Sequence, residues 1–262
     1  MSLLKNKITF CLMYCGEETL NECLKSIEPF KKDIVWQEVC NVTPQTKALN
    51  QMLTQVNTEY LVPLDADMIL NQNSFDRILN AIKLHENNKN WHSILFPLWD
   101  TFTDRKILAL KVLRMDIIKN FLFKESRTPD IIHFHDLKNA GYVAITEDEP
   151  IGFHVVKGKY FSYMKYKDVY QTYRQHKWEW DSGVFFGGKT LQEKVRNHFD
   201  FFIYNSIIKK SDDYLWALAG MMDGLTSPLN GQSKDLSDSI KIDKSQAIDF
   251  YLKWIINFEK IF

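Results

Sequence analysis

Two acidic side chains, Asp65 and Asp67, follow directly on the apolar run 60–64 and are separated by Ala66. Alternate residues of a strand point to one face, so these carboxylates would repel each other unless a cation lay between them. Oxygen ligands suit Mg²⁺ or Mn²⁺, and Mg²⁺ commonly shares its coordination shell with substrate phosphates. The triplet therefore predicts a metal site. The structural alternative is that Asp67 caps a following helix and Asp65 hydrogen-bonds a loop.

The segments around this triplet alternate between two hydrophobic patterns. Short apolar runs without a helical period predict buried strands, and apolar residues spaced i, i+3, i+4 and i+7 predict helices packed on a sheet. This alternation is typical of an α/β fold with a mostly parallel sheet, helices on both faces, and ligands at the carboxyl ends of the strands. The expected strands cover residues 8–14, 34–39, 60–64 and 93–98, and the expected helices cover residues 17–27, 44–56 and 75–82.

The rest of the chain divides into a less regular stretch and a helical tail. We expect a catalytic core over residues 1–160 and a helical extension over 161–262. The segment 224–239 is rich in Gly, Ser and Asn, which predicts a loop that could close as a lid, as could the turn at 99–105. Further elements are expected as strands at 107–113, 142–145 and 152–156, and as helices at 116–123, 130–140, 162–177, 190–209, 212–223 and 244–262.

Composition limits the classes of function. The formal net charge is +0, so nucleic acid is not an expected partner. The four cysteines (Cys11, Cys15, Cys23 and Cys40) match neither a zinc site nor a redox pair, which indicates a reducing compartment. No apolar run is long enough for a transmembrane helix and no signal peptide is visible, so we expect a cytoplasmic protein.

Several motifs resemble those of family 2 glycosyltransferases, which have the GT-A fold. The first block reads MYCGEETLNECLKSI, and the second reads QTKALNQMLTQVNTEYLVPLDADMIL and ends in Asp-x-Asp. The stretch 130–142 resembles the acceptor-side helix of the family, and GFHVVKG carries a His after the last core strand. The resemblance implies a GT-A-like, Rossmann-type core that moves a hexose from a nucleoside-diphosphate sugar of the UDP or GDP type, with inversion at the anomeric carbon. The acceptor would be a hydroxyl of a glycan or a lipid-linked molecule.

The resemblance also implies roles for particular residues. Asp67 would bind the metal, Asp65 would lie near the metal and the ribose, and His154 would be a further metal or diphosphate ligand. Asp130 is the position that matches the general base. The remaining nucleotide-site residues would be Tyr14 and Glu17 near the base, Lys47, Asn50, Ala66, and Glu38, which is the one acid near a second strand where most members carry an acidic run.

Each of these residues has a structural alternative. His154 could be a core or loop histidine, Asp130 could act only on the dipole of its helix, and Lys47 could be a solvated helix residue. The run 178–181 (WEWD) could bind an acceptor by stacking or simply pack the tail. The last helix is apolar around most of its circumference, so it is buried, joins a second subunit or touches a membrane surface.

Three rival functions remain open. An apolar strand followed by Asp-x-Asp also resembles the nucleophile motif of haloacid-dehalogenase-like phosphatases, although Met68 and Ile69 replace the usual Gly-Thr. A nucleotidyltransferase uses a similar sheet but usually has a basic, Gly-rich loop, whereas residues 15–18 read CGEE. A nucleotide- or carbohydrate-binding protein without catalysis is the non-enzymatic alternative.

Overall fold

The computed structural model describes residues 6–175, 191–227 and 242–257. It divides into two compact units, Met1–Val156 and Lys157–Phe262, which are described separately below. The roles that the sequence suggests for these two parts stay predictions.

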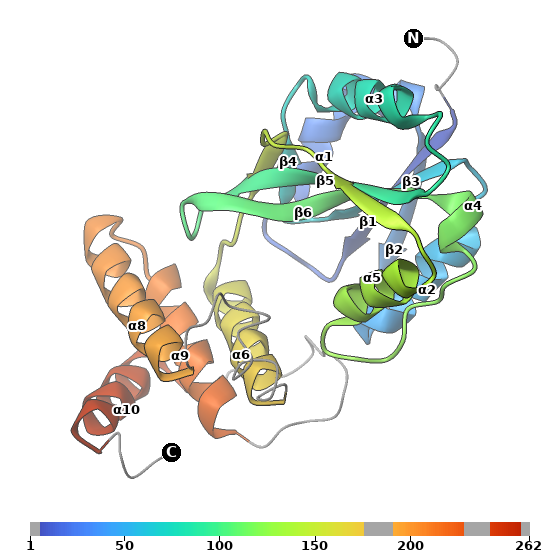
Figure 1. The fold of residues 1–262 in the computed structure, drawn as a ribbon. Coiled ribbons are helices and arrows are strands. Elements are labelled where there is room, and N and C mark those ends of the chain that lie inside the picture. Colours follow the sequence, from blue (N-terminus) through green and yellow to red (C-terminus); the bar gives the residue numbers. More distant parts are fainter. Residues whose placement is uncertain (1–5, 176–190, 228–241, 258–262) are drawn as a thin grey trace. The chain divides into compact units, whose positions relative to one another are not determined.

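The first unit is built on one eight-stranded sheet (Figure 1). Its strand order is β2-β1-β3-β6-β5-β8-β4, with β7 also paired to β5. β1, β2 and β3 pair in parallel, β6 runs antiparallel between β3 and β5, and β4 pairs antiparallel with β8, so most strands share one direction. The strands are β1 (Ile8–Tyr14), β2 (Val35–Cys40), β3 (Tyr60–Asp65), β4 (Met68–Leu70), β5 (Trp91–Asp100), β6 (Arg105–Arg114), β7 (Val143–Thr146) and β8 (Gly152–His154).

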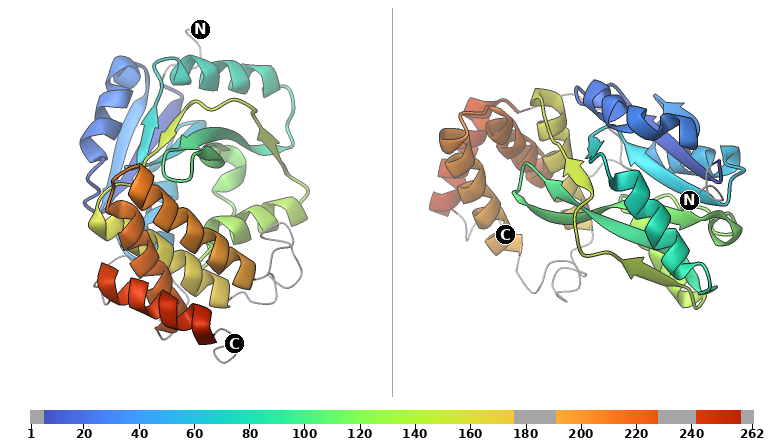
Figure 2. Two further views of the ribbon diagram at one scale, coloured as in Figure 1. Left: turned by 90° about the vertical axis from the view of Figure 1, so that its left-hand side faces the viewer. Right: turned by 90° about the horizontal axis from the view of Figure 1, so that it is seen from above.

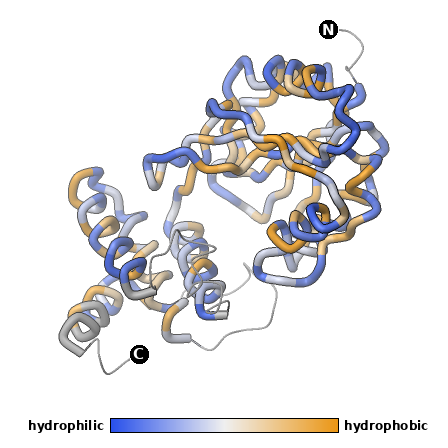
Figure 3. Tube along the Cα trace, viewed as in Figure 1, coloured by the Kyte–Doolittle hydropathy of each residue, from blue (hydrophilic) through white to orange (hydrophobic). Residues whose placement is uncertain are grey.

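Helices cover both faces of this sheet, because its central strands are apolar on both sides. In β1, Phe10 and Leu12 belong to one hydrophobic cluster, and Cys11 between them belongs to the other. The orange tube of Figure 3 follows these central strands. The first cluster includes α1 (Leu20–Ile27) and α3 (Ser74–His85), and the second includes α2 (Gln45–Gln55), α4 (Met115–Ile118) and α5 (Pro129–Asn139) (Figures 1 and 2).

Two local differences from the expected elements have clear causes. The first helix begins at Leu20 rather than at residue 17, because Gly16 has a positive φ of 94° and Glu17 accepts a 2.7 Å hydrogen bond from the Cys15 N–H, which turns the chain. The expected helix 116–123 is wrong beyond Ile118, where the chain turns. The turn expected after residue 100 is confirmed as the hairpin between β5 and β6.

The second unit is helical in its described part. It contains α6 (Lys159–Gln175), α8 (Leu191–Ile208), α9 (Asp213–Thr226) and α10 (Lys244–Asn257), and the other three helices all contact α9. The expected loop at 224–239 is wrong at its start, since α9 continues through Thr226, and residues 228–241 lie outside the described residues. The run 178–181 and residues 258–262 also lie outside them. No helix in the described ranges is long and apolar enough to cross a membrane.

Close packing explains why α9 keeps two glycines. A Cβ built on Gly220 would come within 1.9 Å of the Tyr163 carbonyl oxygen, and one on Gly224 within 2.5 Å of the Lys167 carbonyl oxygen. The backbones of α6 and α9 therefore approach each other along a face that only glycine permits. Gly224 looks like a loop residue in the sequence but is a packing residue in the structure.

We expect Gly220→Ala to destabilise the protein by about 1–3 kcal/mol, because the added methyl group must push α9 away from α6. Helix propensity alone predicts the opposite sign, a gain of about 1 kcal/mol for Ala over Gly. Urea unfolding followed by circular dichroism measures the free energy of unfolding of both forms. A more stable variant would contradict the packing of these two helices.

Candidate active site

Strand pairing brings Asp67 and His154 together. Asp67 precedes β4, and Met68 at the start of β4 is opposite His154 at the end of β8. The Val155 N–H donates a 2.8 Å hydrogen bond to the Asp67 carbonyl oxygen, and the His154 Nε2 lies 3.2 Å from Asp67 Oδ2. The interpretation of Asp67 as a helix cap is wrong, because a strand follows it and α3 begins only at Ser74.

A second carboxylate, Asp100, holds the other side of the His154 ring. His154 Nδ1 lies 2.8 Å from Asp100 Oδ2, and Asp100 Oδ1 accepts hydrogen bonds from the Thr103 N–H at 2.6 Å and the Thr103 hydroxyl at 2.8 Å. The Asp100 side chain is 3% exposed. An ionised carboxylate only accepts hydrogen bonds, so Asp100 holds a proton on Nδ1. Nε2 faces the second carboxylate, Asp67, and a cation between these two groups would take the place of a proton on Nε2. The sequence analysis missed Asp100, whose only signal is its position at the end of a buried strand.

The chemistry of these side chains fits a divalent cation. A carboxylate and an imidazole nitrogen side by side are metal ligands, and an imidazole held by a carboxylate on its other nitrogen is a common outer-shell arrangement. Among the residues described, no group of three or more His, Cys, Asp or Glu side chains could hold a metal ion by itself. A cation at Asp67 and His154 would therefore need ligands from a substrate, as Mg²⁺ does at phosphates.

Asp65 lies at the carboxyl end of β3, beside β1. Its register partner is Met13, and the Ala66 N–H donates to the Met13 carbonyl oxygen at 3.3 Å. The Cys23 thiol lies nearby, and burial first, then the charges of Asp67 and Asp65, raise its pKa to about 12. The two carboxylates thus create a negative region at the strand end that a cation would neutralise.

One cleft of about 250 Å³ is lined by Asp65, His154 and Asp130 together. Lys111 from β6 and His133 from α5 also line this cleft. Three residues that the family resemblance selected from distant parts of the sequence therefore share one site. Asp67 is not itself a lining residue and reaches this cleft through its contact with His154. The other predicted site residues outside the lining are Tyr14, Glu17, Glu38, Lys47, Asn50 and Ala66.

Asp130 stands in the first turn of α5, where Pro129 opens the helix and an acid is favoured by the helix dipole. Its Oδ2 lies 3.1 Å from Lys111 Nζ, in an ion pair whose side chains are 23% exposed for Lys111 and 50% for Asp130. Lys111 also lies over the Phe134 ring, 5.2 Å from its centroid. Lys111 is a second residue that the sequence did not single out. It is one of several cations in β6, and no motif distinguishes it from the others.

The Tyr14 and Glu38 side chains form a small cluster at the ends of β1 and β2. The Tyr14 hydroxyl donates to Glu38 Oε2 at 3.1 Å, and the Trp36 indole N–H donates to Glu38 Oε1 at 2.7 Å. Hydrogen bonds to Cys40 first, and then to Glu38, raise the Tyr14 pKa to about 12. This cluster stands beside the carboxyl ends of β1 and β2. Its contact with a nucleobase stays a prediction.

Lys47 and Asn50 lie on α2, with different surroundings. Lys47 is exposed, whereas the Asn50 amide both donates to the Phe123 carbonyl oxygen and accepts from the Phe123 N–H, each at 2.9 Å. Asn50 thus fixes the backbone of Phe123, which lines the cleft. Its direct approach to a nucleotide stays a prediction.

His133 is a further buried group of this cleft. Its Nε2 lies 2.9 Å from the Phe121 carbonyl oxygen, which can only accept, so Nε2 carries the proton. Its ring stacks on Phe123 with centroids 4.1 Å apart, and burial is the main cause that lowers its pKa. His135, two residues along α5, is exposed. Side chains two residues apart on a helix do not share a face, so these two histidines do not form a metal pair.

A solved mannosyltransferase shares this architecture. Mannosyltransferase PcManGT from Pyrobaculum calidifontis, in complex with GDP-Man and Mn²⁺, superposes with a TM-score of 0.52 at 14% identity, covering 99% of this chain and 82% of that one. The fold is GT-A-like. The mostly parallel sheet with helices on both faces that the sequence predicts is therefore confirmed.

Two other solved structures are less similar. S. aureus TarS residues 1–349 has a TM-score of 0.46 at 14% identity, covering 84% of this chain and 81% of that one. Glucosyl-3-phosphoglycerate synthase from Mycobacterium tuberculosis, in complex with Mn²⁺, UDP and phosphoglyceric acid, has 0.47 at 10% identity, covering 66% and 80%. Both structures therefore share only a loose likeness with this chain. No protein-family model and no curated protein matches the sequence.

Proposed function

We propose that the protein transfers a sugar from a nucleoside-diphosphate sugar to an acceptor hydroxyl. The observation that carries this proposal is the single cleft that Asp65, His154 and Asp130 line, at the carboxyl ends of the strands of a GT-A-like fold. Ligands bind at that edge in open α/β sheets. The solved mannosyltransferase holds GDP-Man and Mn²⁺, which favours a GDP-linked donor and a divalent metal for this chain. The resemblance of the sequence motifs also allows a UDP-linked donor.

On the donor side, Asp67 and His154 would hold Mn²⁺ or Mg²⁺, with Asp65 close to the ribose. The cation would supply charge stabilisation to the leaving diphosphate, worth several kcal/mol. Asp100 would orient His154 with Nε2 toward the cation, because Asp100 accepts a hydrogen bond from the Nδ1–H of the ring. The chain thus orients its ligands before the donor arrives.

On the acceptor side, Asp130 would act as the general base. The acceptor oxygen attacks the anomeric carbon from the side opposite the diphosphate, the bond to the diphosphate oxygen breaks, and Asp130 takes the hydroxyl proton. This displacement inverts the anomeric centre. Lys111 holds the carboxylate at the edge of the cleft through their 3.1 Å ion pair.

The proposal is tested by thermal shift with GDP, UDP, CDP and dTDP, each with and without Mn²⁺. At a ligand concentration of 100 times Kd, binding stabilises the folded state by about 2.7 kcal/mol, so a metal-dependent rise in melting temperature is expected for at least one nucleotide. Incubation with GDP-mannose or a UDP-sugar should then release the nucleoside diphosphate. In parallel incubations, release of pyrophosphate from a nucleoside triphosphate and a sugar phosphate would indicate a nucleotidyltransferase, and release of inorganic phosphate from a phosphomonoester would indicate a phosphatase. No response to any nucleotide would contradict the transferase.

We expect Asp100→Asn to weaken Mn²⁺ binding by about 10- to 100-fold, the usual cost of losing an outer-shell partner. The Asn side chain can still accept from the Thr103 N–H, but its NH₂ then faces His154 Nδ1. That contact favours the tautomer with the proton on Nε2, the nitrogen that would bind the metal. Titration with Mn²⁺ in the presence of the responding nucleoside diphosphate, in which electron paramagnetic resonance detects the free Mn²⁺, measures the affinity without any turnover.

Asp104→Asn is the matched control for this change. Asp104 is exposed in the same β5–β6 turn and accepts a 3.1 Å hydrogen bond from the Trp99 indole rather than from a histidine. Its substitution should leave the Mn²⁺ affinity unchanged. Equal effects of the two substitutions would show that Asp100 supports the turn and not His154.

A further inference from the structure

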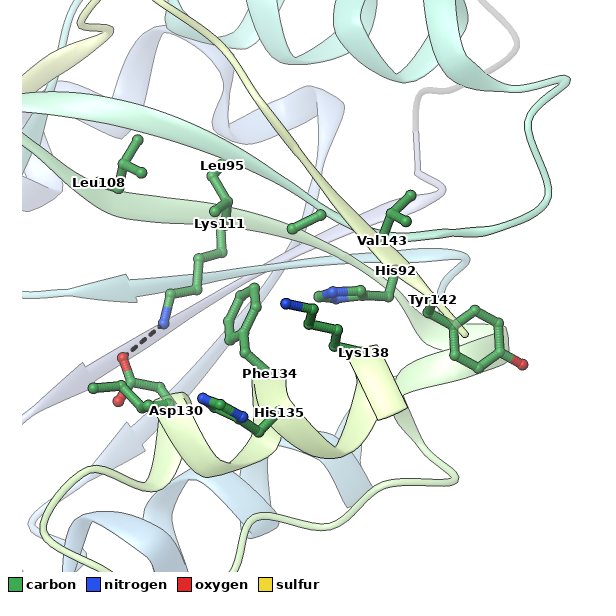
Figure 4. A pocket seen from close by; sticks show the side chains of 12 residues that line it. His92, Leu95, Leu108, Lys111, Asp130, Phe134, His135, Lys138, Tyr142 and Val143 are labelled. Carbon is green, nitrogen blue, oxygen red and sulfur yellow. Dashed lines mark hydrogen bonds and ion pairs between the residues drawn. The ribbon is translucent and has the colours of Figure 1, made fainter. Parts of the chain in front are cut away.

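A second pocket lies against the Lys111–Asp130 pair, between α5 and strands β5, β6 and β7 (Figure 4). Its volume of about 580 Å³ falls within the range of small-molecule sites. It shares Leu108, Lys111, Asp130 and Phe134 with the cleft that holds Asp65 and His154. A molecule in this pocket can therefore reach the same carboxylate as a donor in the cleft.

Most of the lining is apolar, and part of it is exposed. Leu108 is 54% exposed and Val143 is 49% exposed, although burying such side chains is favourable. Figure 4 shows the ring of Phe134 between Lys111 and His92. The other apolar lining residues are Leu95, Ile131 and Ala144. These surfaces suit the apolar body of a ligand.

His92 supplies one buried polar atom at this pocket. It is 2% exposed, its Nδ1 has no hydrogen-bond partner, and its ring meets Phe134 edge-on with centroids 5.0 Å apart. Burial, and then the neighbouring His133, lower its pKa to about 4, so the ring is neutral at pH 7. Buried polar atoms without a partner are rare in folded proteins.

The charges of the lining favour an anion. Lys111 and Lys138 are both cations, and Asp130 is the only acid in the lining. Lys111 is already paired with Asp130, whereas Lys138 is exposed at the third turn of α5. His135, also exposed, lies on the same side and can donate a hydrogen bond.

We propose, resting on the transferase function above, that this pocket binds the acceptor, and that the acceptor is a small alcohol or phenol with an apolar body and an anionic substituent. The apolar body packs on Phe134 and Leu95. The anionic substituent lies at Lys138, and the attacking hydroxyl reaches Asp130. The pocket volume matches a single small molecule rather than an extended glycan.

Fluorescence titration with 1-naphthyl phosphate, without nucleotide, tests the pocket. The probe has an apolar body and an anionic group, and 1-naphthol and inorganic phosphate each carry only one of the two. Ala144→Trp fills the pocket from β7, and Ala140→Trp places the same side chain at an exposed position beyond α5 that does not line it. Lys138→Gln removes the cation, and Lys119→Gln, also exposed, is its control.

We expect 1-naphthyl phosphate to bind more tightly than 1-naphthol, and inorganic phosphate to displace it only at a much higher concentration. Ala144→Trp should weaken it by at least about 10-fold, the effect of a group that does not fit a pocket. Lys138→Gln should weaken the binding of 1-naphthyl phosphate by about threefold, because an exposed charge contributes little. It should leave the affinity for 1-naphthol unchanged. The two control variants should bind like the parent protein.

Three outcomes would overturn the proposal. Binding that Ala144→Trp and Ala140→Trp affect equally would place the probe elsewhere. If 1-naphthol bound more tightly than its phosphate, the pocket would not favour an anionic substituent on the acceptor. The protein could also bind vesicles of phosphatidylcholine and phosphatidic acid. If it did, and Ala144→Trp abolished that binding, the occupant would be a lipid headgroup instead of a soluble molecule.

The nucleotide thermal shift keeps this proposal separate from the transferase function. Nucleotide binding without probe binding overturns the acceptor pocket and leaves the transferase function standing. Probe binding without any nucleotide response overturns the acceptor role, because no donor would be present to react.

Discussion

Asp67→Asn should abolish the Mn²⁺-dependent stabilisation by nucleoside diphosphates and lower sugar transfer by about 10²-fold or more. Asp67 Oδ2 lies 3.2 Å from His154 Nε2, so one substitution removes a charged ligand from the centre of the predicted metal site. A metal bridge to a leaving diphosphate is worth several kcal/mol, and each 1.36 kcal/mol is tenfold in rate. Thermal shift with the responding nucleotide, with and without Mn²⁺, measures the first effect, and product release measures the second.

The Asp67 result needs a control for charge alone. Asp148→Asn removes one negative charge from an exposed position between β7 and β8, and it should leave both measurements unchanged. If Asp67→Asn still responded to Mn²⁺ and nucleotide like the parent protein, the metal site would be misplaced. Nucleotide binding that never depended on metal would point to a metal-independent transferase on the same fold.

Asp130→Asn should lower kcat by about 10²- to 10⁴-fold, the usual contribution of a general base, with little change in nucleotide binding. Asn cannot accept the acceptor proton, but it keeps the size of the side chain. The Lys111 ion pair is partly exposed and contributes at most about 1 kcal/mol to stability, so the variant should remain folded. Steady-state kinetics with the identified donor separate kcat from KM, and thermal unfolding checks stability.

Asp136→Asn is the matched control on the same helix. Asp136 also pairs with a lysine, since its Oδ2 lies 2.7 Å from Lys124 Nζ, but it lines neither pocket. Its substitution should leave kcat unchanged. If Asp130→Asn lost stability but not kcat, the acid would act only on the helix dipole, and the base would have to be sought elsewhere in the cleft.

Much of the fold was predictable because its signals are local. The run 8–14 is a strand in the structure with the same bounds, and the helical stripe of residues 75–82 lies within α3. Asp65 and Asp67 stand at the end of a strand, as their position after an apolar run predicts. These features depend on neighbours within one or two turns, which the hydrophobic period records.

Other features depend on pairing between distant segments. The sequence pattern does not show that β6 lies antiparallel between β3 and β5, nor that the short strands β4 and β8 pair. This pairing brings His154 to Asp67, and the parallel register of β5 and β8 brings Asp100 to His154. A single register shift would turn these side chains to other faces, so no local pattern could predict their contact.

The triplet Asp65-Ala66-Asp67 illustrates both what the sequence determines and what only the tertiary structure decides. The residue types and the strand before them determined that two carboxylates stand at the carboxyl end of a strand, the edge where open α/β sheets bind ligands. Only the tertiary structure decided which groups face them: His154 beside Asp67, Asp100 behind His154, and Asp130 with Lys111 across the same cleft. The physical reason is that hydrophobic periodicity places a side chain on a face, whereas strand order and register choose its neighbours.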